Sequence, residues 1–251
     1  MTAGALLFAR YAYPPNALGY CGGGTSRTLL EYGSAGCSDA GLAEAARTFE
    51  GAWPYLELIA HANRLPDPLD RRVVEAYWIG NELLDGVAPA ELARHVDERF
   101  RGRIGRTSGR VTEAALAGAV PHHDFHVFAV YPWVGLLRTG IVDEPLDVLE
   151  RCRITPARVV GVRGDVLNTI VRPLAWDGRA LRLGPWIDRT ARWRDDGLAF
   201  VGPPGPGEWV ALHWDWVCDR LTAAQASRLT RTTNRTLAAV NRSGSTAAAL
   251  A

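Results

Sequence analysis

The hydrophobic pattern of the chain changes near Thr155, and this change constrains the fold more than any other feature. Before it, candidate caps, prolines and glycines delimit a series of helices. After it, several short segments alternate between apolar and polar residues as strands do, and Asp177-Gly178 stands between two of them as a hairpin turn. The sequence therefore predicts helices followed by an antiparallel β unit, and not a parallel nucleotide-binding sheet.

Local signals set the expected bounds of each element. Ser38 or Asp39 caps a long helix that Pro54 interrupts, and Gly86 ends the next helix. The segment 121–137 suits either a helix or a β-rich run, and Pro132 interrupts both. The expected helices cover residues 40–63, 68–85, 88–100, 111–119, 143–151 and 222–240, and the expected strands cover 157–163, 166–176, 179–183, 198–201 and 209–214.

The fold class that follows is α+β, with a mainly helical N-terminal portion, a small antiparallel β unit and a closing C-terminal helix. Residues 8–24 contain two prolines and four glycines, which favour irregular backbone, but they also carry large aromatic side chains that need burial. We therefore expect an ordered aromatic arm within the helical portion, residues 1–153. Residues 154–242 form the β unit and closing helix, packed with the first portion as one unit, and 243–251 form a frayed tail.

Composition excludes several classes of function. The chain has 28 basic residues and none is lysine, so phosphate-loop and Schiff-base lysines are ruled out. A net charge of +1 argues against non-specific nucleic-acid binding, and we interpret the arginine-rich stretch 94–110 as a solvated loop. No apolar run is long enough to span a membrane, no signal peptide is evident, and the four cysteines form no CxxC pair. We expect a cytoplasmic protein.

The densest polar cluster is His122, His123, Asp124 and His126. In an extended segment His122, Asp124 and His126 would share one face, whereas in a helix His122 and His126 would lie one turn apart. Either geometry could hold a divalent transition metal, with His213 as a distant further ligand. The alternative is that these histidines cap helices and line the edge of the core.

A second cluster follows in the segment 212–219, where His213, Asp215 and Asp219 alternate with tryptophans. Strand alternation would place His213 and Asp215 on one face and Trp214 and Trp216 on the other. A histidine oriented by a carboxylate in a dry aromatic wall suggests a catalytic pair, His213 with Asp215. The alternative is a core strand whose tryptophans pack and whose polar atoms are hydrogen-bonded.

A third group lies on the expected helix 68–85. Glu82 is a candidate acid or base there, and Tyr77, Trp78 and Asn81 form a polar aromatic patch beside it. Trp214 and Cys21 complete the candidate ligand-binding residues, because Cys21 precedes three glycines that would allow close approach of a ligand or of another backbone. Interhelical hydrogen bonds are the alternative role for the helical residues.

Four strings carry a resemblance to a known family: YAYPPNALGYCG at 11–22, VVEAYWIGNELL at 73–84, PHHDFHVFAVYPWVGLL at 121–137 and LHWDWVCDRLT at 212–222. With them the chain resembles, over residues 4–242, an uncharacterised bacterial family associated with genes for NiFe hydrogenases and their accessory proteins. The resemblance supplies no catalytic residues. It implies an accessory or maturation role around a metalloenzyme, with a hydrogenase subunit or maturation factor as partner.

Two principal hypotheses therefore come from the sequence. The first is an accessory protein that acts on or with a metalloenzyme. The second is a metal-dependent enzyme that uses His122, Asp124, His126 and His213, with Glu82 as acid or base. A binding module that uses the tryptophan walls without chemistry is a third possibility.

Overall fold

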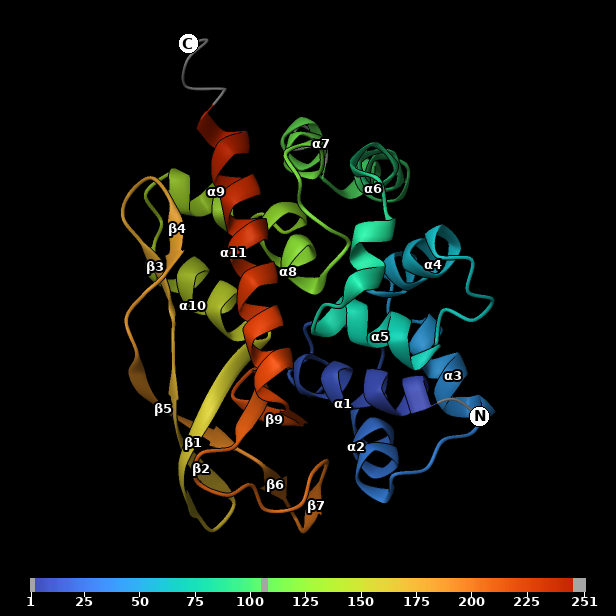
Figure 1. Cartoon of the computed structure of the whole chain (residues 1–251), viewed down its shortest axis with the longest axis vertical. Helices are drawn as coiled ribbons and strands as arrows, with labels where there is room; N and C mark the ends of the chain where they lie inside the picture. The colour runs from blue at the N-terminus through green and yellow to red at the C-terminus, as the bar shows by residue number, and fades with distance from the viewer. Residues whose placement is uncertain (1–2, 105–107, 246–251) are drawn as a thin grey trace.

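The computed structural model describes residues 3–104 and 108–245, and it confirms the α+β class. In Figure 1 the helices of the N-terminal half lie on one side and the strands on the other, with the last helix running between them along the long axis. The helices are α1 (Ala3–Ala17), α2 (Ser26–Ala35), α3 (Ala40–Arg47), α4 (Trp53–Ala62), α5 (Arg71–Trp78), η1 (Glu82–Gly86), α6 (Pro89–Ile104), α7 (Ser108–Leu116), α8 (His123–Phe125), η3 (His126–Val130), α9 (Trp133–Arg138), α10 (Asp143–Cys152) and α11 (Ala223–Ser245).

The prediction of irregular backbone over residues 8–24 was wrong for 8–17, which belong to a helix, whereas 18–24 are irregular as expected. Helix α1 runs through Pro14 and Pro15 and buries Phe8 and Tyr11 completely. The prolines lie in its last two turns, where each lacks the N–H that would donate to the carbonyl four residues earlier, and the burial of the aromatic rings offsets this loss. Because Pro15 has no N–H to donate to the carbonyl four residues earlier, the helix leaves the carbonyl of Tyr11 without its usual partner.

Two other segments are also helical where the structure describes them. The solvated loop expected over 94–110 was wrong for 94–104, which belong to α6, and for 108–110, which belong to α7, while Arg106 lies outside the described residues. Residues 121–137, which the sequence left open, are helical: α8 leads into the π-helical turn η3 and then α9. Pro54 does separate α3 from α4, as expected, because α4 starts one residue before it.

The strands form a small closed barrel in the order β1-β2-β5-β9-β8, beside two short hairpins. Most pairs are antiparallel, as predicted, but β5 and β9 pair in parallel through Arg192 and Trp216. The predicted hairpin turn at Asp177-Gly178 joins β3 to β4. The strands are β1 (Thr155–Arg163), β2 (Val166–Val171), β3 (Leu174–Trp176), β4 (Leu181–Leu183), β5 (Ile187–Arg192), β6 (Arg194–Asp195), β7 (Leu198–Ala199), β8 (Trp209–His213) and β9 (Trp216–Leu221).

The β8–β9 connection corrects the expected alternation through 212–219. Strand β8 ends at His213, and Trp214 and Asp215 form the turn, both with positive φ of 52° and 57°. Chain direction reverses there, so His213 and Asp215 do not share a strand face as predicted. A tryptophan in the left-handed region is unusual, and the turn is held by hydrogen bonds from the Trp214 N–H to the Arg151 carbonyl and from the Arg192 N–H to the Asp215 carbonyl.

Helix α11 joins the two halves of the molecule. Thr222 caps it reciprocally with Gln225, as the sequence predicted for the start of the helix. The helix continues to Ser245, so the described part of the predicted tail is helical, and residues 246–251 lie outside the described residues. The main hydrophobic cluster includes side chains from α1, α5, β9 and α11. Among the described helices, none is long and apolar enough to cross a membrane.

Candidate metal centre

A cavity of about 710 Å³ lies where α1, α5, η3, α10 and the end of β8 meet. Its wall includes the fully buried ring of His213, which is 1% exposed, and the ring of Tyr20, which is 53% exposed. The cavity therefore extends from the interior to the surface. Its volume is in the range that small-molecule sites occupy.

Three potential metal ligands converge on the wall of this cavity. One ring nitrogen of His123, one of His213 and the Sγ of Cys152 lie within 4.8 Å of one another. Among the residues that the structure describes, this is the one such group of three His, Cys, Asp or Glu side chains. Donor atoms around one bound zinc ion stand about 3.3–3.6 Å apart, so an ion would draw these three together by about 1 Å.

His213 is oriented by helix α1, in which Pro15 leaves one backbone carbonyl free. Its Nδ1 lies 2.7 Å from the Tyr11 carbonyl, the group that Pro15 leaves without a helical partner. A carbonyl only accepts, so Nδ1 carries the proton and the lone pair is on Nε2. That Nε2 is buried and makes no hydrogen bond of good geometry, although the Cys152 carbonyl also lies near the ring. A histidine whose second nitrogen donates to a backbone carbonyl is the usual arrangement of a metal ligand.

His123 is oriented in the same way by the end of α10. Its Nε2–H donates to the carbonyl of Cys152 at 2.8 Å, a C-terminal carbonyl that has no partner within the helix. The lone pair of His123 is then on Nδ1, which accepts a hydrogen bond of 3.3 Å from the Tyr77 hydroxyl. Cys152 thus contributes both its thiol to the group and its carbonyl to the orientation of the group.

Burial keeps the three ligands in their neutral forms. Desolvation lowers the pKa of His123 to about 4. It also lowers the pKa of His213 well below the ordinary histidine value, and repulsion by His123 adds to the shift of His213. Desolvation likewise raises the pKa of the Cys152 thiol. Neutral imidazoles are ready to bind a metal, whereas the thiol must lose its proton when it does.

The predicted set His122, Asp124 and His126 does not converge on one point. His122 is sealed in the core as the cap of α8, where its Nδ1 accepts from the Asp124 backbone N–H. Asp124 is also fully buried and accepts a hydrogen bond of 2.6 Å from Thr233 of α11. His126 lines the cavity, and its Nδ1 lies 3.3 Å from the Tyr55 hydroxyl. It does not belong to the three-ligand group. His122 and Asp124 face each other, with Nδ1 3.7 Å from a carboxylate oxygen, whereas the His126 ring contacts Tyr55 instead.

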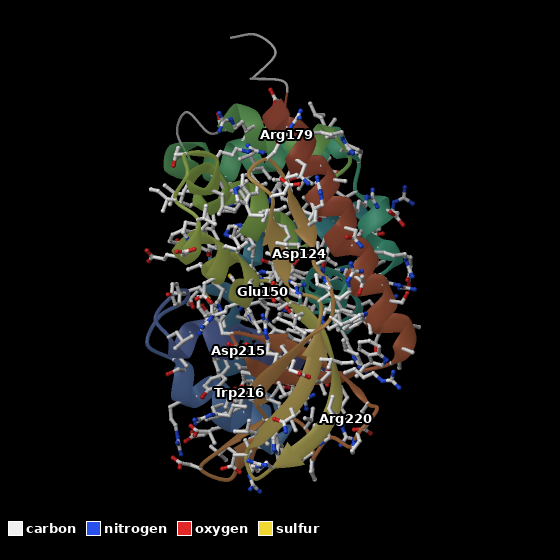
Figure 2. All side chains as sticks on the ribbon, turned by 90° about the vertical axis from the view of Figure 1, so that its left-hand side faces the viewer. Asp124, Glu150, Arg179, Asp215, Trp216 and Arg220 are labelled. Atoms are coloured by element: carbon white, nitrogen blue, oxygen red, sulfur yellow. The ribbon has the colours of Figure 1, made fainter. Side chains whose placement is uncertain are left out.

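The remaining predicted residues divide into two sets. Those that line the cavity with the three ligands are Cys21, Tyr77, Trp78 and Trp214. Asn81 instead caps η1, and the exposed Glu82 pairs with Arg228 of α11 at 3.1 Å. Asp215 lies in the turn beyond His213, 3.8 Å from Arg151 and 3.9 Å from Arg189. In Figure 2, Glu150 lies between Asp124 and Asp215 along the long axis, so the two aspartates are separated in that direction.

Sequence reasoning missed Cys152 and passed over His123. Cys152 ends a helix 29 residues after His123 and shares no local motif with it. The signal that could have found them is indirect: a histidine at the first position of a short helix, and a cysteine at the last position of another. Both places expose polar backbone groups that can orient a side chain.

A family model matches residues 1–247, and its description is a family of unknown function, DUF6390. The chain belongs to this family. No curated protein and no solved structure matches it. The description of DUF6390 names no activity, and it does not mention hydrogenases.

Proposed function

We propose that this DUF6390 protein binds one transition-metal ion through His123, Cys152 and His213 and holds it in an accessory role for a metalloenzyme. The observation that carries the proposal is the convergence of these three ligand atoms within 4.8 Å on the wall of a cavity. The tautomer of His213 adds to it, because Nδ1–H donates to the Tyr11 carbonyl and the lone pair of Nε2 is then available to an ion.

The ligand set indicates which ions would bind. One thiolate and two imidazoles suit Zn²⁺, Ni²⁺ or copper, whereas hard cations such as Mg²⁺ prefer oxygen ligands. The C-terminal end of α10, at Cys152, also favours a cation through the partial negative charge of its free carbonyls. All four cysteines are free, so we place the protein in the cytoplasm, where thiols stay reduced.

Elemental analysis of the purified chain tests metal binding. We expect about one zinc, nickel or copper ion per chain, and loss of that ion in the Cys152→Ser/His213→Ala double variant. The matched control is Cys37→Ser/His61→Asn, which changes the same residue types at exposed positions. Equal metal content in the two double variants would refute the site.

The accessory role has support from the resemblance to hydrogenase-associated proteins and from the site having three protein ligands rather than four. An ion held by three ligands and reached through a cavity can be taken up and given away. Deletion of the gene in a host that makes a NiFe hydrogenase should lower hydrogenase activity, and pull-down should recover a hydrogenase subunit or maturation factor. Normal activity together with recovery of neither would exclude that partner.

A second candidate function is a metal-dependent enzyme, in which the ion activates water for attack on a small molecule. The observation that favours it is the cavity itself, because 710 Å³ is more space than an ion alone requires. Catalytic zinc sites commonly have three protein ligands and one open position. A hydrolase screen on metal-loaded protein, with the Cys152→Ser variant as blank, distinguishes this candidate from the accessory role.

A further inference from the structure

The cavity wall holds another thiol besides the three ligands, at Cys21. Cys21 is half-buried and lies in a segment that we call the glycine loop, residues 18–24, which follows α1. Cys21 and Cys152 both line this one cavity, which places the two thiols around the same space.

The glycine loop is docked on the same hairpin that carries His213. The ring of Tyr20 stacks on Trp214, with the ring centroids 4.3 Å apart and the planes at 21°. Asn16 holds the loop from the other side, since its Nδ2 donates to the carbonyls of Cys21 at 2.7 Å and Gly23 at 2.6 Å. These contacts hold the glycine loop against the hairpin of His213, so that Cys21 lines the cavity while staying outside the 4.8 Å group of three ligands.

The glycines of the loop are not all explained by the conformation that the structure shows. Gly22 needs to be glycine, because its φ is +74° and a Cβ would meet the Phe49 ring at 2.6 Å. Gly23 and Gly24 have ordinary φ values, and a Cβ on either would meet no atom within 4 Å. Because glycine has no Cβ, these two residues allow the loop to adopt backbone conformations other than the resting one.

We propose that Cys21 is the fourth ligand of the metal ion, and that the glycine loop moves to bring its Sγ onto the ion held by His123, Cys152 and His213. Coordination releases the Cys21 thiol proton to water and forms one metal–sulfur bond, with no change of oxidation state. The site then alternates between an open state with three protein ligands and a closed state with two imidazoles and two thiolates. This proposal rests on the proposed metal function and deepens it.

The other side chains of the cavity that could ligate an ion are less suited to the fourth position. His126 lies outside the group of ligand atoms that are within 4.8 Å of one another, and its Nε2 would be 3.0 Å from a Cβ on Gly51, so the ring has little room to move toward the group. Glu50 is exposed and would supply a hard oxygen ligand to a site that otherwise has nitrogen and sulfur. A second thiolate completes a set of two cysteines and two histidines, which is common in closed tetrahedral sites.

Cobalt substitution counts the thiolates directly. Co²⁺ is added anaerobically to apo-protein, and the near-ultraviolet sulfur-to-cobalt charge-transfer band, whose intensity scales with the number of Co–S bonds, is measured. We expect the band of Cys21→Ser to have about half the wild-type intensity at the same one-to-one stoichiometry. The Cys37→Ser control should match the wild type.

The cobalt band distinguishes failure of the Cys21 assignment from failure of the metal site. An unchanged band in Cys21→Ser overturns the fourth-ligand assignment and leaves the three-ligand site standing, whereas no band in the wild type overturns the metal site itself. X-ray absorption of the zinc-loaded wild type needs no variant: two sulfurs at about 2.3 Å support the proposal, and one sulfur contradicts it.

The loop motion has its own test. The Gly23→Ala/Gly24→Ala variant should keep the wild-type melting temperature of the apo-protein but lose about half of the band, because alanine fits the resting conformation and restricts the closed one. Gly161→Ala of β1, another open position without positive φ, is the matched control. A wild-type band in the double-alanine variant would show that the thiol binds without a glycine-dependent movement and would overturn that part of the proposal.

Discussion

His122 and His123 are consecutive residues, both buried, and they have opposite roles. His122 is fully buried as the N-cap of α8, where its Nδ1 accepts a hydrogen bond from the Asp124 backbone N–H. His123 points to the cavity, where α10 and β8 each bring one more ligand. Burial lowers the pKa of His122 to about 3 and that of His123 to about 4, so the ionisation of the two rings does not distinguish them. What does distinguish them is direction: the backbone at the start of α8 turns one ring into the core and the next toward open space.

The largest effect that tests this comparison should come from His122→Ala, which removes the buried imidazole. His122→Ala removes a helix cap and leaves a cavity in a fully packed region, so we expect the free energy of unfolding to fall by about 2–4 kcal/mol. Metal affinity should stay within about twofold of the wild type, because the ring is not a ligand. Urea unfolding and a chelator competition measure the two quantities. His122→Asn, which keeps a capping side chain, should recover part of the stability.

Metal binding should stabilise the folded protein, and this stabilisation should require the His123 ring. Zinc at 100 times its dissociation constant should raise the free energy of unfolding by about 2.7 kcal/mol, if the ion binds the folded chain alone. The increase should be absent in His123→Ala and present in His122→Asn. Chemical denaturation with and without zinc measures it, and a zinc effect that survives His123→Ala would contradict the assignment of that ligand.

A smaller effect is expected from Pro15→Ala, which tests the orientation of His213 through α1. An alanine N–H at position 15 can donate to the Tyr11 carbonyl and compete with His213 Nδ1 for it. Loss of an outer partner of a metal ligand usually costs about 10–100-fold in affinity, and we expect the lower end, about 10-fold. The stability of the apo-protein should not fall. Zinc titration reports the affinity, and unchanged affinity would show that the carbonyl does not orient His213.

The smallest effect should come from Asp124→Asn in the sealed cluster. Burial raises the pKa of Asp124, while the Thr233 hydroxyl that donates to it acts in the opposite direction. The neutral amide keeps an acceptor for Thr233 and removes a buried charge, so stability should change by less than about 1 kcal/mol at neutral pH. Metal content should be that of the wild type. Loss of the ion in Asp124→Asn would indicate that Asp124 is a metal ligand.

Much of the fold was predictable because local signals agreed with tertiary structure. The Asp177-Gly178 turn, the cap at Thr222 and the break at Pro54 each depend on a few neighbouring residues. The exceptions show where packing prevailed: α1 is helical through two prolines, since burial of Phe8 and Tyr11 outweighs the missing N–H groups. The parallel contact between β5 and β9 depends on barrel closure, which no local pattern records.

The candidate site was predictable only in part, for a related reason. Sequence patterns placed Cys21, Tyr77, Trp78, His213 and Trp214 among the functional candidates, and the structure gathers all of them on one cavity wall. They could not show that His123 rather than His122 faces that wall, because this depends on the conformation of residues 121–126. Nor could they connect Cys152 with His123 and His213, because the position of Cys152 follows from the packing of α10 against α9, β3 and η3.

Anaerobic titration of apo-protein with zinc against a chromophoric chelator tests the central claim most directly, in the wild type, Cys152→Ser and His122→Asn. The account predicts one ion per chain in the wild type, an affinity at least about 100-fold weaker in Cys152→Ser, and no change in His122→Asn. The reverse pattern, with affinity retained in Cys152→Ser or lost in His122→Asn, would contradict it.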